Sequence, residues 1–467
     1  MLYTRYRILT TASNGFTLIE AMFFLFIFMI ISLGFMQTYA TGAHMIIESK
    51  NRLGATALAN QKMEIIRSID YSLIGTKHWN GSSWVYGVPG GDILEDETVG
   101  VNTVAYAVHT YVQYNDDPYD GTLGGSPNDT IPNDYKQVRL TVSWGQGGTD
   151  QSVATFADFS PNGIETSAGG GILSINILDS TGAGVSGATV RVKNPSSSID
   201  FTTTTDATGN ITTVGAPAGT QKYELSVSKN GYYGAVTYPP YPTTAYNPTD
   251  THASVVNGVL NPMTVVMDHA TDIHLMTKDP FGTSIPNINY HVKGGRILGV
   301  DTLTSPATTI YGLDQNGATD DSGETTLSSQ SYGPYALSSI STAQYDFYKL
   351  SPEDVKNDTF SVAAGVTKDV TAILLDKSIG SVKVTVTSSV AAAPVSGATV
   401  HLTEGALGYD ATATTDQYGV AYFPTALPAL VDGTYTIDVS ESSFTSDSST
   451  VTISGTLVNK SVVLTPS

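Results

Sequence analysis

The carboxylates best placed to do chemistry gather in one glycine-rich segment between two strand-like stretches. This segment reads NDDPYDGTLGGSPNDTIPNDY and contains Asp116, Asp117, Asp120, Asp129 and Asp134. Clustered carboxylate oxygens suit Ca²⁺, which takes about six to eight oxygen ligands. Asp, Asn, Pro and Gly are also favoured in ordinary turns, and the spacing differs from that of an EF-hand. We therefore treat Asp116, Asp117 and Asp120 as candidate calcium ligands and keep a plain turn as the alternative.

No other stretch of the chain carries a familiar catalytic motif. We find no P-loop, HExxH, GxSxG or dinucleotide fingerprint, and none of the 8 His is paired with another at i, i+4. His109 lies in a strand-like stretch, and we interpret it as a surface or half-buried side chain rather than a ligand. The absence of Cys excludes disulfides, zinc-thiolate sites and cysteine nucleophiles. We expect a protein that is not an enzyme and needs no cofactor apart from the candidate calcium.

The composition indicates an exported, multidomain β-protein. The chain has 467 residues, more than one core usually organises, and 42 Asp+Glu against 22 Lys+Arg give a net charge of -20. Such a charge argues against binding to nucleic acid or to anionic lipid headgroups. The 45 Gly, 21 Pro and 26 Tyr are typical of many short strands joined by tight turns.

One further carboxylate, Glu20, lies inside a long apolar run. The 13 Phe, Leu and Ile residues between positions 16 and 35 favour membrane insertion by about 4 to 8 kcal/mol, against a cost of about 3 kcal/mol for one acid. Residues 1–14 carry Arg5 and Arg7 and no acid, so the positive-inside rule predicts a cytoplasmic N-terminus. We expect residues 16–36 to span the membrane once.

The stretch GFTLIE, followed by about twenty apolar residues, resembles the processing motif of type IV prepilins and type II secretion pseudopilins. The resemblance implies that a peptidase/N-methyltransferase cuts the leader, residues 1–15, after Gly15 and methylates Phe16. It also implies that Glu20 balances the terminal amine of a neighbouring subunit in a filament. In this chain the basic residues lie eight and ten positions before Gly15, and no helix-bending Pro follows.

Two other interpretations of the apolar run stay open. A cleaved secretory signal would use the small residues Ala40 and Gly42, although the run is longer than a usual signal core. A plain signal anchor would leave Glu20 as an incidental acid near the interface.

The resemblance and the periodicity together predict an α+β pilin domain. We expect one helix over residues 16–70, apolar all round in its first half and amphipathic afterwards, about 80 Å long. An antiparallel sheet over residues 71–165 would cover its second half, with strands at 104–112, 138–144 and 152–159 and a further one near 83–86.

Residues 166–171 read TSAGGG, and we interpret them as a linker to three repeats. VSGATVRV (185–192) and VSGATVHL (395–402) are followed by TDATG (205–209) and TDQYG (415–419), and TDDSG (319–323) marks a degenerate middle copy. We place the copies at 172–268, 269–376 and 377–467. We expect the Asp of each T-D-x-x-G to hold a turn while its Gly takes positive φ.

These repeats resemble carboxypeptidase-regulatory-like and CnaB-like β-sandwiches, which are all-β, Ig-like or prealbumin-like, and usually act as stalks, spacers or binding modules. The resemblance names Lys383 and Asn459 as a candidate isopeptide pair.

The stretch GYYGAVTYPPYPTTAY contains Tyr232, Tyr233, Tyr238 and Tyr241, which we treat as a candidate adhesive surface, with packing on the sandwich as the alternative. The insertion at 294–318 is a second candidate.

The sequence thus predicts a type IV pilin-like subunit, a minor pilin that displays sandwich domains as a stalk or adhesin. Its partners would be other pilin subunits, the processing enzyme, the membrane before assembly and a surface ligand, but not nucleic acid. Its location would be the cytoplasmic membrane and then a surface pilus or fimbrium. The alternatives are a type II secretion pseudopilin and a membrane-anchored surface stalk that does not polymerise.

Overall fold

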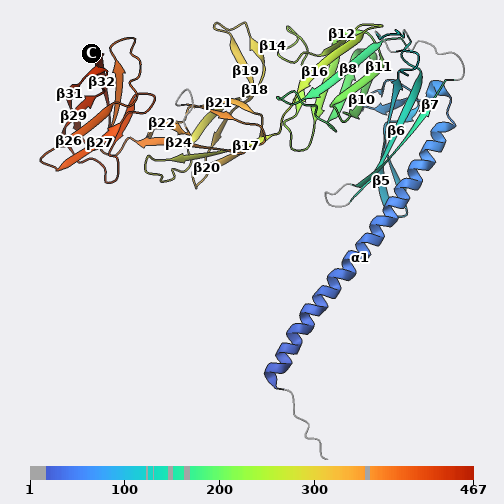
Figure 1. Cartoon of the computed structure of the whole chain (residues 1–467), viewed down its shortest axis with the longest axis horizontal. Helices are drawn as coiled ribbons and strands as arrows, with labels where there is room; N and C mark the ends of the chain where they lie inside the picture. The colour runs from blue at the N-terminus through green and yellow to red at the C-terminus, as the bar shows by residue number, and fades with distance from the viewer. Residues whose placement is uncertain (1–16, 122–124, 130, 146–150, 162–168, 353–357) are drawn as a thin grey trace, which may run out of the picture. The chain divides into compact units, whose positions relative to one another are not determined.

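A computed structural model describes residues 17–121, 125–129, 131–145, 151–161, 169–352 and 358–467. Internal contacts divide the chain into two compact units. The first comprises Met1–Thr122 and Ile131–Ser167, and the second comprises Leu123–Thr130 and Ala168–Ser467. The architecture is one long N-terminal helix followed by many β-sheets, most of them paired as sandwiches (Figure 1).

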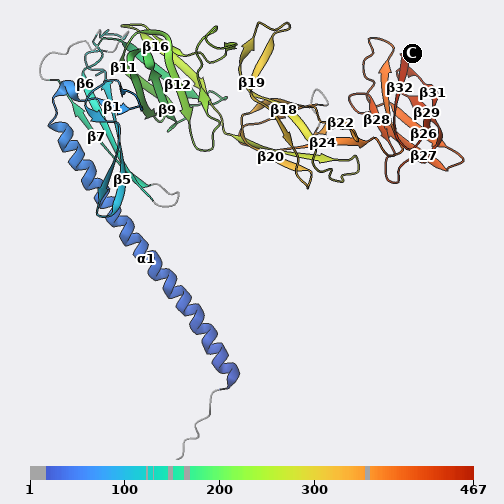
Figure 2. The ribbon, with the colours of Figure 1, turned by 180° about the vertical axis from the view of Figure 1, so that it is seen from behind.

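The helix α1 runs without interruption from Leu18 to Arg67, close to the predicted 16–70. Its first half lies beyond the sheet of its own unit in both views (Figures 1 and 2). Its second half buries one stripe of side chains, as the amphipathic pattern predicts: Ala55, Leu58, Ala59, Met63 and Ile66. Ser68 caps the C-terminus of the helix, and its N–H donates to the carbonyls of Ile65 and Ile66.

The first unit also contains a four-stranded antiparallel sheet in the order β4-β5-β6-β7. These strands span Asp96–Val101, Val104–Asn115, Tyr135–Trp144 and Gln151–Phe159. The buried helix stripe shares one hydrophobic core with this sheet, through residues such as Tyr106, Val138 and Trp144. Three predicted strands are therefore confirmed as β5, β6 and β7. The fourth forms as β2 (Trp84–Tyr86), but it pairs with β1 and not within the β4-β5-β6-β7 sheet.

Sequence analysis missed four short elements of this unit, namely η1, β1, β3 and β4. After the 3-10 turn η1 (Tyr71–Leu73), β1 (Thr76–Trp79) pairs antiparallel with β2 and parallel with β3 (Ile93–Leu94). Strand β4 follows β3 after one residue, Glu95, so this corner joins the small β1-β2-β3 group to the main sheet.

In the second unit, residues 171–266 form two facing sheets. The first contains β13-β12-β9-β10, with β15 beside β12, and the second contains β11-β8-β16. Their bounds are β8 Gly171–Leu178, β9 Thr189–Asn194, β10 Ile199–Thr204, β11 Asn210–Ala216, β12 Gly219–Ser228, β13 Ala235–Val236, β15 Ala253–Val255 and β16 Leu260–Val266, with η2 at Pro195–Ser197. Ile175, Val190 and Tyr223 are fully buried between the sheets.

The next pair of sheets has the orders β14-β18-β21-β23, with β19 beside β18, and β20-β17-β24-β22. Their bounds are β14 Asn247–Pro248, β17 Thr271–Lys278, β18 Asn289–Asp301, β19 Thr308–Ala318, β20 Glu324–Gln330, β21 Gly333–Ser338, β22 Tyr345–Ser351, β23 Thr359–Val362 and β24 Lys368–Asp376. The predicted insertion is therefore not an irregular loop, because β18 and β19 form a long antiparallel hairpin there.

The last pair has the orders β28-β25-β32-β30 and β27-β26-β29-β31. Their bounds are β25 Ser381–Ser388, β26 Thr399–Glu404, β27 Tyr409–Thr414, β28 Val420–Phe423, β29 Gly433–Ser440, β30 Phe444–Thr445, β31 Asp447–Ile453 and β32 Leu457–Pro466. In all three sandwiches the first strand pairs in parallel with a late strand, as β8 with β16, β17 with β24 and β25 with β32. The shared topology confirms that the three sequence copies are structural repeats.

Candidate functional site

The first part of α1 is an apolar surface without cover from the rest of the protein. Its large hydrophobic residues are exposed. For example, Phe23, Leu25 and Phe28 are 66%, 67% and 63% exposed. The helix is long and apolar enough to cross a membrane, by length and composition, and its most apolar window has no buried residue. This part of the chain therefore needs another apolar partner, either lipid or protein.

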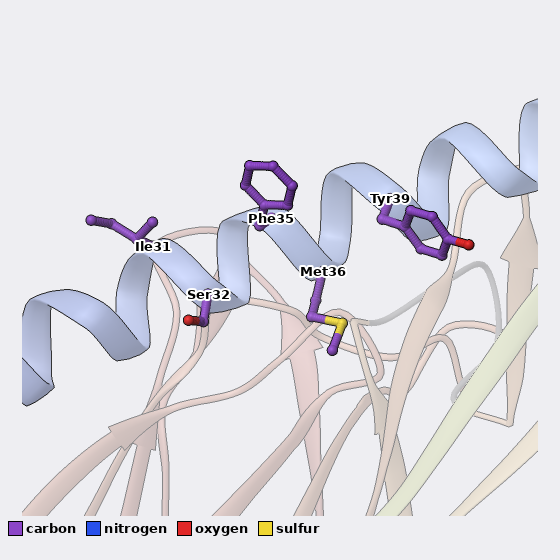
Figure 3. A pocket seen from close by; sticks show the side chains of 5 residues that line it. All are labelled: Ile31, Ser32, Phe35, Met36 and Tyr39. Atoms are coloured by element: carbon purple, nitrogen blue, oxygen red, sulfur yellow. The ribbon is translucent and has the colours of Figure 1, made fainter.

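A shallow hollow on α1 does not change this description. Its lining residues are Ile31, Ser32, Phe35, Met36 and Tyr39, all from the same helix. Ile31 and Phe35 point to one side of the helix, whereas Ser32 and Met36 point to the other (Figure 3). The hollow is a gap between side chains of one exposed helix rather than an enclosed ligand site.

Glu20 lies in the first turn of α1, and the structure gives it a local environment that sequence analysis missed. Thr17 is the N-cap, and its hydroxyl accepts a hydrogen bond from the Glu20 N–H at 3.3 Å. A T-x-x-E spacing is the capping-box pattern, and an acid in the first turn also favours the helix dipole. Gly15 and Phe16, the predicted processing residues, lie outside the described residues.

The acidic segment closes the hairpin between β5 and β6. The N–H of Asp117 donates to the Asp134 carboxylate, and the Asp134 N–H donates to the Asn115 carbonyl at 3.1 Å. Asp116 and Asp117 are partly buried, whereas Asp120 is exposed. Residues 122–124 and 130 lie outside the described part of the chain, so calcium binding stays a prediction.

Measuring the unfolding temperature with and without Ca²⁺ would test calcium binding. We expect Ca²⁺ to raise the unfolding temperature of the wild type but not that of Asp117→Asn.

The T-D-x-x-G stretches have the structural role that their sequence predicts. One carboxylate oxygen of Asp206 accepts from the N–H groups of Thr208 at 2.8 Å and Asn210 at 2.9 Å. Asp320 and Asp416 make the equivalent bonds in the other copies. The closing glycines have φ of 83°, 78° and 72° at Gly209, Gly323 and Gly419. These Asp residues are turn anchors.

A buried tyrosine recurs in all three sandwiches, and only its first and last copies could be predicted from the Y-x-x-x-V pattern. The hydroxyls of Tyr223, Tyr335 and Tyr435 donate to the carbonyls of Pro217, Ser331 and Val431 at 2.6, 2.6 and 2.8 Å. Each bond ties a strand to the preceding connection.

The tyrosine-rich stretch is largely packing rather than a free surface. The Tyr232 ring lies 4.0 Å from the ring of His269, and Tyr238 meets Tyr246 edge to face at 6.2 Å. Tyr246 lies against Gly299, where an added Cβ would be 2.5 Å from the ring. Of the four predicted binding residues, only Tyr241 is exposed, at 43%, whereas Tyr232, Tyr233 and Tyr238 are half-buried.

This stretch belongs to a polar and aromatic joint between the first two sandwiches. The Arg296 guanidinium on β18 pairs with the Asp250 carboxylate at 2.8 Å, with both side chains about four-fifths buried at 17% and 21% exposure. Arg296 also donates to the carbonyl of Val266. Strand β14 pairs with β18 through Asn247 and Pro248. A connection within the first sandwich, between β13 and β15, thus adds a strand to a sheet of the second.

Lys383 and Asn459, the candidate isopeptide pair, are neighbours in the register of β25 and β32. Both positions lie on the outward face of the strand pair, since Lys383 is half-buried and Asn459 exposed, whereas Val382 and Val384 are buried. The core side of these strands is therefore filled by valine, and the pair supplies no buried cross-link.

Two arrangements of ionisable side chains in the first unit were not found from the sequence: the buried Lys136 and a cluster of histidines and carboxylates. Lys136 is buried, and its ammonium donates to the carbonyls of Tyr71 and Ile74 at 2.7 and 2.8 Å. Burial lowers the pKa of Lys136 to about 8. A lysine between valine-rich strand positions was the available signal, but its carbonyl partners lie more than sixty residues away in the sequence.

The second cluster contains His78, Glu95, Asp96 and His109. His78 Nδ1 is 2.7 Å from a Glu95 oxygen, and His109 Nδ1 is 2.8 Å from an Asp96 oxygen. Burial lowers the pKa of His109, but the hydrogen bond to Asp96 and the charges of Asp96 and Glu95 together raise it by more. The hydrogen bond from His109 is the main cause that lowers the pKa of Asp96.

The comparison with protein families matches one segment of the chain. Residues 172–257 match the carboxypeptidase regulatory-like domain family, which confirms the predicted resemblance for the first sandwich. No curated protein sequence matches the chain.

Among solved structures, the Bacillus anthracis TIE protein is similar at 14% identity and a TM-score of 0.20, covering 85% of this chain and 74% of that one. A streptococcal ancillary pilin has 11% identity and a TM-score of 0.19, covering 64% and 99%. BcpA, the major pilin subunit of Bacillus cereus, has 12% identity and a TM-score of 0.16, covering 64% and 100%. TM-scores this low do not establish a shared fold, so these similarities carry no argument about function.

Proposed function

We propose that this chain is a type IV pilin-like subunit, of the minor pilin kind, that carries three β-sandwiches on a surface filament. Its role would be structural and adhesive rather than catalytic. The observation that carries the proposal is the division of α1, whose second half is buried against a sheet while its first half exposes an apolar surface. In a filament, that surface would pass from lipid to the helices of neighbouring subunits.

The position of Glu20 supports the same proposal. A carboxylate at the start of an apolar helix is costly in lipid unless a cation or donor compensates it. Cleavage after Gly15 would create a terminal amine on Phe16. In a filament, the Phe16 amine of an adjoining subunit would compensate the Glu20 carboxylate. The GFTLIE motif supplies the processing site that this account requires.

The first experiment is mass spectrometry of the mature N-terminus in cells that express the full chain. The proposal expects a chain that begins with methyl-Phe16. A chain that retains Met1 would contradict it and favour a plain membrane anchor, and a cut near Ala40 would favour a secretory signal.

The second experiment asks whether the subunit reaches sheared surface filaments. We expect Glu20→Gln to reduce incorporation at least tenfold while leaving membrane levels unchanged, because the amide still suits a helix N-terminus but cannot neutralise an amine. Glu48→Ala, farther along the same helix, is the matched control. Normal assembly of the Glu20 variant would refute the charge-pairing step, and presence only in secretion complexes would favour a pseudopilin.

The adhesive part of the proposal concerns the sandwiches. Among the exposed apolar side chains of the sandwiches are Tyr241, in the tyrosine-rich stretch, and Leu303, which lies at the tip of the β18–β19 hairpin and is 73% exposed. We expect whole cells carrying Tyr241→Ser or Leu303→Ser to adhere less while displaying equal amounts of subunit. Unchanged adhesion in both variants would leave the sandwiches as spacers.

A further inference from the structure

We propose that Glu95, Asp96 and His109 form a binding site for a divalent transition-metal ion, best suited to Zn²⁺, with His78 orienting Glu95. This inference is independent of the filament proposal, because it concerns only the corner between β3, β4 and β5. It also replaces the interpretation of His109 as an ordinary half-buried side chain.

The geometry of the three side chains converges on one point. One ligand atom from each residue lies within 4.8 Å of the other two. Zn²⁺ bonds to His nitrogen and carboxylate oxygen are about 2.0–2.2 Å, so tetrahedral ligands lie about 3.3 Å apart. Small side-chain rotations would therefore close the site without movement of the backbone.

Backbone hydrogen bonding holds all three residues in place. Asp96 and His109 are direct partners in the antiparallel register of β4 and β5. The Glu95 N–H donates to the Lys77 carbonyl at 3.0 Å, and the Glu95 carbonyl accepts from the Thr110 N–H at 2.7 Å. Glu95 is thus fixed between β1 on one side and β5 on the other, which limits the entropy lost when a metal binds.

The burial of the three ligands increases from Asp96, which is open to solvent, to Glu95, which lies in the interior. Glu95 is 3% exposed, whereas the side chains of His109 and Asp96 are 30% and 74% exposed. His78, 24% exposed, bonds to the Glu95 carboxylate at 2.7 Å, the outer-shell arrangement that orients a metal ligand. An ion could enter beside Asp96 and keep a water in its fourth position.

The donor set selects the class of ion. An imidazole with two carboxylates favours Zn²⁺ and its first-row neighbours, whereas Ca²⁺ and Mg²⁺ prefer oxygen ligands alone. Bound there, the ion would tie β1, β4 and β5 together in a chain that has no Cys for disulfides. The nearby Arg139 opposes cation binding, since its charge acts on His109.

A second histidine cluster provides the control. His274 approaches Asp369 through Nδ1 at 3.2 Å and Glu324 through Nε2 at 3.3 Å. Its two ring nitrogens point to opposite sides, so these three residues cannot place their ligand atoms around one ion. His274→Gln should leave metal binding unchanged.

The test is titration of the tag-free full chain in detergent with Zn²⁺ by calorimetry, and with Co²⁺ by its visible absorption. We expect one equivalent to bind, with affinity at least tenfold weaker in Asp96→Asn and His109→Gln and unchanged in His274→Gln. Absence of stoichiometric binding, or equal affinity in all variants, would overturn the proposal.

A stability readout covers the case in which a variant folds poorly. All three Trp residues, Trp79, Trp84 and Trp144, lie in the first unit, so their fluorescence follows its unfolding. Zn²⁺ should raise the unfolding midpoint of the wild type and of His274→Gln but not that of Asp96→Asn, whose exposed side chain leaves the fold intact. An equal shift in Asp96→Asn would refute the site.

Discussion

At the residue scale, the polar side chains of this protein act mainly by satisfying backbone groups. Main-chain atoms are the partners of Lys136, of the three turn aspartates (Asp206, Asp320 and Asp416) and of the three buried tyrosines (Tyr223, Tyr335 and Tyr435). Such bonds matter because an unpaired polar group inside a protein costs about 1–3 kcal/mol. Their removal should therefore be measurable as lost stability.

Lys136 predicts a pH dependence of the first unit. Its pKa of about 8 is below the ordinary value of 10.5, so the unfolded chain binds more protons between these values. The free energy of unfolding should then rise as pH increases from 8 to 9.5, by about 1–2 kcal/mol. Well below pH 8 both states are protonated, so the cost of burying the charged lysine is fully present and the free energy of unfolding no longer depends on pH through this group.

Trp fluorescence during denaturation would measure that rise, with Lys136→Met as the comparison because it removes the titrating amine and keeps the aliphatic stem. Parallel pH profiles for the wild type and Lys136→Met would show that the lysine is not responsible.

The threonine before each turn aspartate should also contribute to the stability of its sandwich. The buried Thr415 hydroxyl donates to the Val395 carbonyl at 2.7 Å and accepts from the Ala398 N–H at 2.9 Å. Thr415→Val keeps the shape but leaves both groups unpaired, so we expect a loss of about 1–3 kcal/mol. Hydrogen exchange of β26 and β29 would measure it, and the exposed Thr450→Val should change little. Equal effects of the two substitutions would contradict the role of the Thr415 bonds.

At the element scale, one close contact in the first unit joins α1 and β5. The Tyr106 hydroxyl donates to the Asn51 carbonyl at 2.9 Å, and the Tyr106 ring meets Trp144 edge to face at 6.2 Å. Gly54 makes this approach possible, because a Cβ there would be 2.5 Å from the Tyr106 hydroxyl oxygen. Lys62 adds an ion pair with Glu97 on β4 at 2.6 Å.

Gly54→Ala should therefore destabilise the first unit although alanine favours helices. We expect a loss of about 1–3 kcal/mol from the forced shift of Tyr106. Gly42→Ala is the matched control, since nothing lies within 4 Å of that position. It should be neutral or stabilising by up to about 1 kcal/mol. Denaturation followed by Trp fluorescence would compare them, and a stabilised Gly54→Ala would show that the contact adapts freely.

At the scale of the whole molecule, each of the two units is held together by its own internal contacts. The second unit contains three sandwiches that follow one another along the chain. The joint between its first two sandwiches is ordered by the Arg296–Asp250 pair and by the addition of β14 to β18. A partly buried ion pair with a carbonyl contact is costly to break on one side only, because the other charge is left without compensation.

Arg296→Ala should loosen this joint without unfolding either sandwich. We expect protease cleavage between residues 239 and 250 to increase at least threefold, because Asp250 in this segment would lose its partner Arg296 and the bond from Arg296 to the Val266 carbonyl would also be lost. Lys293→Ala removes an ion pair with Asp314 that stays within the β18–β19 hairpin, at 3.3 Å, and should leave cleavage unchanged. Equal cleavage in both variants would mean that packing of the tyrosines alone orders the segment.

The sequence by itself determined the long helix, the strands β5, β6 and β7, and the three repeats with their T-D-x-x-G turns. These features depend on local periodicity and on turn residues, which act between near neighbours in the chain. The match of residues 172–257 to a family also follows from such local patterns.

Only the tertiary structure decided which distant groups meet. It brought His78, Glu95, Asp96 and His109 to one corner, placed Lys136 on the carbonyls of Tyr71 and Ile74, and turned most of the tyrosine-rich stretch into a packed joint. The isopeptide candidates proved to be register neighbours on an outward face. These outcomes depend on strand register and on the path of long connections, where a shift of one residue moves every side chain to the other face.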